Sequence, residues 1–155
     1  MRNVVRRSIG SLIMSSLVAL CLSAVQSVTA QERSYINPSS PGGDGSPFSG
    51  AVMTDDTLFI SGMLGLEGGQ VPAEAEDEAR NVLDAIKATL EDAGMTMNDL
   101  VYVQIFCSDV SHYASFNEVY KTYFTQEFPA RAFVGVGALL FDARFEIQAI
   151  AVKRS

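Results

Sequence analysis

The sequence has 155 residues, with 11 basic and 18 acidic side chains, a net charge of −7 and two cysteines. A chain of this length is predicted to fold as one domain with a sizeable core. The acidic balance argues against nucleic acid and anionic membranes as partners, because both require basic patches.

Residues 1–30 have the pattern of a secretory signal. Three arginines precede a largely apolar, uncharged run at residues 9–25, and a small-residue pattern ends at Ala30. We predict cleavage after Ala30 and export to the periplasm or the medium, with no membrane attachment afterwards. A retained membrane anchor is the less favoured alternative, because the apolar run is short for a span. Residues 31–155 would form the single folded domain, with 8 basic and 18 acidic side chains and a charge of −10.

The pattern of the remaining chain predicts a β-β-α-β-α-β-β order. The expected elements are an extended arm at 31–46, a hairpin of strands 48–53 and 58–61, a helix at 73–93, a strand at 100–106, a helix at 111–124, and strands at 130–136 and 145–152. This is an α+β fold with a mixed sheet whose two helices cover one face. The other face would stay partly bare and apolar, which implies association.

Two features within these elements are predicted to be structural. The acidic cluster from Glu74 to Glu78 opens the first helix, where the helix dipole favours negative charge, and is expected to face solvent. It lacks neighbouring histidines or cysteines, so no metal site is predicted. Cys107 is the only cysteine after position 30 and is expected to be a buried small hydrophobe without a disulfide partner.

Two charged residues stand inside the last apolar runs. Arg131 follows Pro129 in one run, and Glu146 lies near the start of the other, at 145–152. A charge among apolar residues is costly unless it is paired or carries function. A guanidinium grips a carboxylate through two parallel hydrogen bonds, so Arg131 is a candidate anion-binding group with Glu146 as an acid/base carboxylate. The alternative, favoured by spacing alone, is a structural cross-strand ion pair between the two.

Short motifs follow one another in a fixed order at residues 46–52, 60–62, 92–94, 116–120, 129–131 and 146–151. In this order and spacing they resemble the Rid (YjgF-type) family of reactive-intermediate imine deaminases. The resemblance implies a trimer whose sheets form a barrel-like centre, with ligand clefts between neighbouring subunits. It also implies that the arginine of the Pro-Ala-Arg motif, Arg131, holds a substrate carboxylate and that Glu146 positions water. Asn117, Ser61 and Gly62 match the family's other cleft residues.

The implied reaction is hydrolysis of 2-imino or enamine acids to 2-oxo acids and ammonia, without a metal or an organic cofactor. Four departures from the family pattern affect the cleft. Phe48 replaces the usual tyrosine, bulky Phe133 replaces a Cys, Ser or Thr, residues 63–65 replace Gln-Ile-Pro, and residues 139–140 replace Leu-Pro. They predict a more apolar cleft of different shape. The alternative function is a non-catalytic trimer that binds a small carboxylate at the same place.

Overall fold

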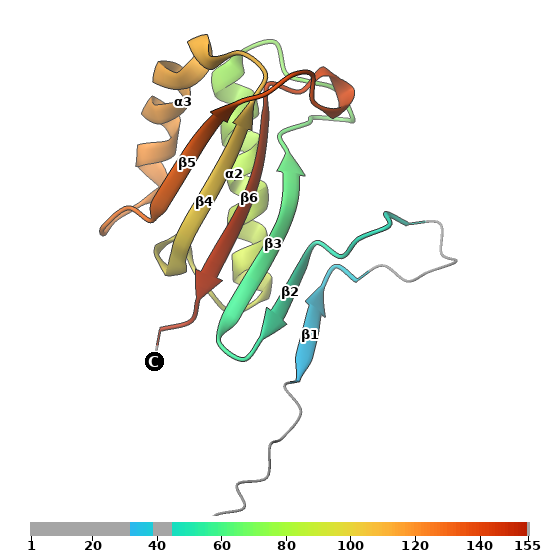
Figure 1. The fold of residues 1–155 in the computed structure, drawn as a ribbon, viewed down its shortest axis with the longest axis vertical. Coiled ribbons are helices and arrows are strands. Elements are labelled where there is room, and N and C mark those ends of the chain that lie inside the picture. Colours follow the sequence, from blue (N-terminus) through green and yellow to red (C-terminus); the bar gives the residue numbers. More distant parts are fainter. Residues whose placement is uncertain (1–31, 39–44, 155) are drawn as a thin grey trace, which may run out of the picture. The chain divides into compact units, whose positions relative to one another are not determined.

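The computed structural model describes residues 32–38 and 45–154, and shows a six-stranded sheet with two α-helices packed on one face (Figure 1). The predicted secretory signal lies outside the described residues. Among those described, no helix is both long and apolar enough to cross a membrane. The strands are β1 (Arg33–Ile36), β2 (Ala51–Thr54), β3 (Thr57–Leu64), β4 (Leu100–Cys107), β5 (Ala130–Gly135) and β6 (Phe145–Val152), and the helices are α2 (Ala75–Asp92) and α3 (Tyr113–Tyr120).

The strand order in the sheet is β1-β2-β3-β6-β4-β5, so the last strand of the chain lies in the middle. The β4–β5 pair is parallel and the other neighbours are antiparallel. The parallel pair requires a crossover, and α3 with its flanking turns supplies it. The predicted α+β class, mixed sheet and one-sided helices are therefore confirmed.

The core lies between the helices and one face of the sheet. The apolar face of α2, which includes Val82, Leu83 and Ile86, is buried there. Alternate residues of the central strands meet it, such as Val103 and Ile105 of β4 and Ile147 of β6. Side chains alternate between the two faces of a strand, so the residues between these point away from the helices.

The face without helices remains partly exposed in the described chain. It carries apolar side chains that are 38–47% exposed, namely Phe59, Val134 and Val152. The edge strand β5 is less buried than its apolar sequence predicted, because β4 is its only neighbouring strand in the sheet. This bare apolar face is the one that the element order predicted.

Several element boundaries differ from the prediction, including the end of β3, which lies at Leu64 rather than at residue 61. The segment expected as an extended arm contains β1, which pairs with β2 from Arg33 opposite Thr54 to Ile36 opposite Ala51. The first hairpin strand begins at Ala51, so Phe48 precedes it. The second α-helix spans only Tyr113–Tyr120, because 3-10 turns at Val110–His112 and Lys121–Tyr123 flank it.

The acidic start of α2 is not wholly solvated, which corrects the sequence-based interpretation. Glu78 is fully buried, and its Oε2 accepts a hydrogen bond from Arg144 Nη1 at 2.8 Å. Its Oε1 accepts from the backbone N–H groups of Arg144 and Phe145 at 2.7 and 3.1 Å. The buried ion pair of this fold is therefore Glu78–Arg144, and it fastens the start of β6 to α2 (66 residues earlier). Glu74 and Asp77 are exposed, as predicted.

Replacing Glu78 with alanine is expected to lower the free energy of unfolding by about 3 kcal/mol, because it leaves three donors without their buried acceptor. Urea unfolding at one fixed protein concentration would measure the loss. The matched control is Glu74→Ala at an exposed position of the same helix start, with an expected change within about 0.5 kcal/mol. Equal effects of the two substitutions would contradict a structural role for the buried carboxylate.

Candidate carboxylate-binding site

Arg131 lies on the helix-covered side of β5 with its guanidinium against two tyrosines of α3. The guanidinium carbon is 4.7 Å from the ring centroid of Tyr120 and 5.8 Å from that of Tyr113. Among the residues that the structure describes, none forms an ion pair or hydrogen bond with this guanidinium. Aromatic faces attract the cation without occupying its N–H donors, so these donors remain available to an anion.

A cavity of about 350 Å³ opens beside this guanidinium. It is lined by Asn117, Tyr120, Lys121, Phe128, Pro129 and Arg131. Asn117 lies on α3 one turn before Lys121, and Pro129 directly precedes β5. The cavity thus combines the Arg131 guanidinium, the Asn117 amide and the Lys121 ammonium with apolar walls, as small-molecule sites commonly do. The ammonium pairs with Glu118 at 2.6 Å, whereas the guanidinium has no described anionic partner.

Glu146 belongs to a second group of predicted site residues. Its carboxylate lies directly against the backbone of Gly62, where a Cβ would approach Glu146 Oε1 to 2.1 Å. The preceding residue, Ser61, donates from its hydroxyl to the carbonyl of Ser49 at 2.7 Å. Ser61, Gly62 and Glu146 therefore lie close together, and the chain next to Phe48 reaches the same place.

The strand register shows that these two groups lie on opposite faces of the sheet. Arg131 pairs with Val103 of β4, and Val103 pairs with Ala149 of β6, three positions from Glu146. An odd offset reverses the direction of a side chain, so Glu146 points away from the helices while Arg131 points toward them. The structural ion pair considered from spacing does not form within one chain.

The two aromatic departures from the family pattern occupy different places. Phe133 lies two positions after Arg131 on the same face of β5, with its ring 5.1 Å from that of Tyr113 and 5.6 Å from that of Phe116. Phe133 thus forms an apolar wall on the other side of Arg131 from the cavity. Phe48 is 55% exposed and has a free ring for contact with a ligand or another chain.

The remaining reactive side chains of the described domain do not form a second catalytic group. Cys107 is fully buried, and burial raises the pKa of its thiol, which disfavours the nucleophilic thiolate. This agrees with the predicted structural role of Cys107. Within residues 32–38 and 45–154, no three metal-ligating side chains cluster closely enough to hold an ion.

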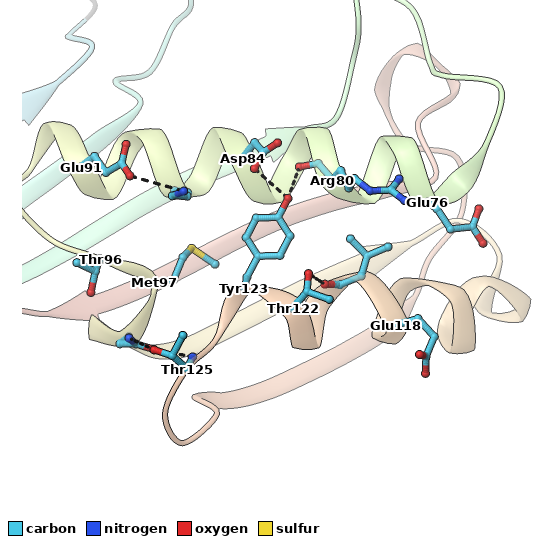
Figure 2. Close-up of a pocket in the computed structure, with 13 residues that line it drawn as sticks. Glu76, Arg80, Asp84, Glu91, Thr96, Met97, Glu118, Thr122, Tyr123 and Thr125 are labelled. Carbon is cyan, nitrogen blue, oxygen red and sulfur yellow. Dashed lines mark hydrogen bonds and ion pairs between the residues drawn. The ribbon is translucent and has the colours of Figure 1, made fainter.

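A larger groove of about 630 Å³ lies between α2 and α3, but most of its charges are already paired (Figure 2). Arg80 pairs with Asp77 at 2.7 Å, and Lys87 approaches Glu91 at 3.9 Å. Tyr123 crosses the groove and donates to Asp84 Oδ1 at 2.9 Å. Among the charged side chains that line the groove, only Glu76 has no described partner, and an isolated carboxylate does not form a site for an anionic ligand.

We expect the protein to lose stability at alkaline pH because of two tyrosines. Burial raises the pKa of Tyr120 to about 12, and burial together with Asp84 does the same for Tyr123. Unfolding returns both hydroxyls toward a pKa of about 10, so the unfolded chain binds fewer protons above that pH. Stability is therefore expected to be fully present below pH 10 and to fall as pH rises from 10 through about 12.

Thermal unfolding between pH 9 and 11.5 would measure this loss. The double variant Tyr120→Phe, Tyr123→Phe should flatten the profile, because it removes both titrating groups. An unchanged slope in the double variant would assign the alkaline loss to other residues.

The fold and these two groups of side chains define a small α+β domain in which the Arg131 guanidinium has no described anionic partner. The profile of the family described as Endoribonuclease L-PSP matches residues 43–153. The chain belongs to this family, which is also called the Rid or YjgF family, and the resemblance seen in its motifs is confirmed.

Named relatives and solved structures agree with this assignment. A 2-iminobutanoate/2-iminopropanoate deaminase of Bos taurus is 40% identical over 110 residues, which cover 69% of this chain and 80% of that protein. Escherichia coli TdcF with bound serine is similar with a TM-score of 0.70 and 33% identity, over 78% of this chain and 100% of that chain. The Rid-family protein YyfA from Yersinia pestis gives a TM-score of 0.70 and 34% identity over 78% and 99%.

Tyr113 and Tyr120 are the site residues that sequence reasoning missed. In the sequence both belong to an aromatic stripe on the predicted helix at 111–124, a pattern that usually indicates core packing. Their spacing of seven residues places them on one face of a helix two turns apart, which is the one available signal. That spacing does not reveal that a cation from β5 lies between them.

Proposed function

We propose that this protein is a hydrolytic deaminase of 2-imino or enamine acids, producing 2-oxo acids and ammonia. The observation that carries the proposal is the Arg131 guanidinium, held against tyrosine faces with no described anionic partner. A 2-imino acid offers the carboxylate that such a group binds with two parallel hydrogen bonds. Similarity to proteins named as imino-acid deaminases supports this choice. The net charge of −7 and a single guanidinium suit a small carboxylate better than RNA.

The chemistry requires a water molecule and one group that moves protons. With the carboxylate on Arg131, the imine carbon is oriented for attack. Glu146 accepts a proton from the attacking water, the oxygen bonds to the imine carbon, and the proton passes to the nitrogen. In the resulting carbinolamine, Glu146 takes the proton of the new hydroxyl and passes it to the amino nitrogen. The carbon–oxygen double bond forms as the carbon–nitrogen bond breaks, so that ammonia leaves and the 2-oxo acid remains. Asn117 and the Ser61–Gly62 segment would line the two sides of the cleft.

The proposed cleft needs two copies of the chain, because Arg131 and Glu146 lie on opposite faces of one sheet. The exposed apolar face supports self-association, and we propose the homotrimer that the family resemblance implies. In this assembly Arg131 and Asn117 of one copy would face Glu146, Ser61 and Gly62 of the next.

Hybrid assemblies test the two-copy cleft. The variants Arg131→Ala and Glu146→Gln should each be inactive, yet unfolding and refolding them together in equal amounts should restore activity. Random mixing gives both intact groups in about a quarter of the clefts, because each copy supplies the right group half of the time. Separately refolded variants, mixed afterwards, are the control. Hybrids that stay inactive would place Arg131 and Glu146 of one chain in the same cleft or remove one of them from the mechanism.

The activity itself is tested by the rate of imino-acid loss with the purified protein. An amino-acid oxidase would generate imino acids in situ, over side chains from small to aromatic. Accelerated loss that depends on Arg131 would support the deaminase. Rates of loss that the protein does not change for any of the imino acids would overturn it.

A second candidate is a non-catalytic carboxylate-binding trimer, which is favoured by the separation of Arg131 from Glu146 within one chain. Binding of a carboxylate without turnover would identify it. Calorimetric titration with 2-oxobutanoate would show the binding, and the imino-acid assay would show no acceleration for any side chain.

We also propose that the protein is exported, on the basis of the residue pattern at 1–30. Cell fractionation followed by N-terminal sequencing tests this directly. A chain recovered outside the cytosol that starts at residue 31 would support export. An uncleaved cytosolic chain would overturn it.

A further inference from the structure

The two tyrosines beside Arg131 differ sharply in how firmly they are held. Tyr120 is 4% exposed, whereas Tyr113 is 48% exposed. The Tyr120 ring stacks on Phe116 at 5.9 Å, contacts Phe124 at 4.8 Å and lies 6.2 Å from Phe128. Tyr120 is therefore fixed by three aromatic neighbours, while Tyr113 has one face in solvent.

The Tyr120 hydroxyl makes no hydrogen bond to any described residue, although it is buried. Burial also raises its pKa to about 12, so the side chain stays neutral at physiological pH. What Tyr120 presents to Arg131 is thus a fixed neutral ring, 4.7 Å from the guanidinium carbon. A ring face at this distance attracts the cation and leaves its N–H edges free.

A fixed platform matters because arginine has a long, flexible side chain. A guanidinium that is free in solution must lose rotamer freedom before it grips a carboxylate with both of its edges. No described carboxylate or carbonyl orients Arg131, so the ring contact has to do so. The structure provides one immobile ring for that purpose.

We propose that Tyr120 is a positioning residue, whose ring holds the Arg131 guanidinium in the orientation that receives the substrate carboxylate. The inference rests on the proposed function only in taking Arg131 as the carboxylate-binding group. It does not require that the bound acid be hydrolysed. Tyr113 assists from the exposed side, and its contribution is smaller because its ring is farther from the cation and 48% exposed to solvent.

The test distinguishes the contribution of the Tyr120 ring to binding from that of its hydroxyl. The probe is 2-oxobutanoate, and calorimetry measures its affinity. Tyr120→Leu should weaken binding about tenfold, because it removes the ring under the cation. Tyr120→Phe keeps the ring and should rescue most of the affinity. Tyr113→Leu should give a smaller loss than Tyr120→Leu. In the imino-acid assay, Tyr120→Leu should raise KM by a similar factor and change kcat less.

Three results would overturn the inference. Normal binding by folded Tyr120→Leu would show that the ring does not position Arg131. A loss in Tyr120→Phe as large as in Tyr120→Leu would assign the role to the hydroxyl. If the unaltered protein did not bind 2-oxobutanoate, the proposed carboxylate site itself would be wrong. By contrast, normal binding without imine hydrolysis would overturn the deaminase proposal and leave the role of Tyr120 intact.

A second measurement covers the case in which Tyr120→Leu does not fold. The Arg131 Nε–H proton of the unaltered protein should show an upfield ring-current shift in its NMR spectrum, because the guanidinium lies over the Tyr120 ring. Assignment comes from the loss of this signal in Arg131→Ala. An Arg131 resonance at the position of solvent-exposed arginines would overturn the contact.

Discussion

Replacing Arg131 with alanine is expected to weaken carboxylate binding by at least about a hundredfold, because both charge-assisted hydrogen bonds to the ligand are lost. The free energy of unfolding should fall by no more than about 1 kcal/mol, since Arg131 makes no described ion pair or hydrogen bond and only its contact with the two tyrosine rings would be lost. Calorimetric titration with 2-oxobutanoate and the imino-acid assay would measure the effect, with size-exclusion chromatography to check assembly.

Two further variants sharpen the result for Arg131. Arg131→Lys keeps the charge and loses the planar fork, so it should recover only part of the affinity. Arg80→Ala removes an exposed arginine from the α2–α3 groove, where it pairs with Asp77, and should leave binding unchanged. If Arg131→Ala lost its assembly while Arg80→Ala kept it, Arg131 would be a structural residue of an intermolecular contact.

Replacing Glu146 with glutamine is expected to reduce turnover by about a hundredfold or more while carboxylate binding is largely kept. The amide preserves the shape of the side chain against Gly62 but cannot take a proton from water. Steady-state kinetics should therefore show a fall in kcat with KM little changed. The same protein titrated with 2-oxobutanoate reports the binding step separately.

The matched control for Glu146 is Gln148→Ala, two positions along β6 on the same face of the sheet. Its side chain is exposed in the described chain and has no assigned part in the chemistry. A variant Glu146→Gln with full activity would remove this carboxylate from the mechanism. The same result would also exclude the non-catalytic carboxylate-binding trimer, because that candidate predicts no turnover in any variant.

The periodic parts of the fold were predictable from sequence. The apolar spacing around Val82 and Ile86 identified α2 to within two residues at its start and one at its end. The polar turn at Asp55 and Asp56 located the β2–β3 hairpin. These signals are local, since they depend on residues a few positions apart on one element.

The errors arose where distant residues decided the structure. Nothing near Arg33 in the sequence reveals that β1 will pair with β2. Glu78 resembled its exposed acidic neighbours until Arg144, 66 residues later, was brought against it. Helix–dipole reasoning applied correctly to Glu74 and Asp77, but burial of Glu78 depends on the packing of β6 against α2.

Sequence by itself determined the family, the order of elements and the two charged residues on which the chemistry would depend. Only the tertiary structure decided that Arg131 and Glu146 point to opposite faces of the sheet, because strand order and register set the direction of each side chain. Only the tertiary structure decided what holds Arg131, since the crossover through α3 carries Tyr120 to a strand that begins ten residues later. Spacing along a chain does not specify which faces meet, whereas packing of the core does.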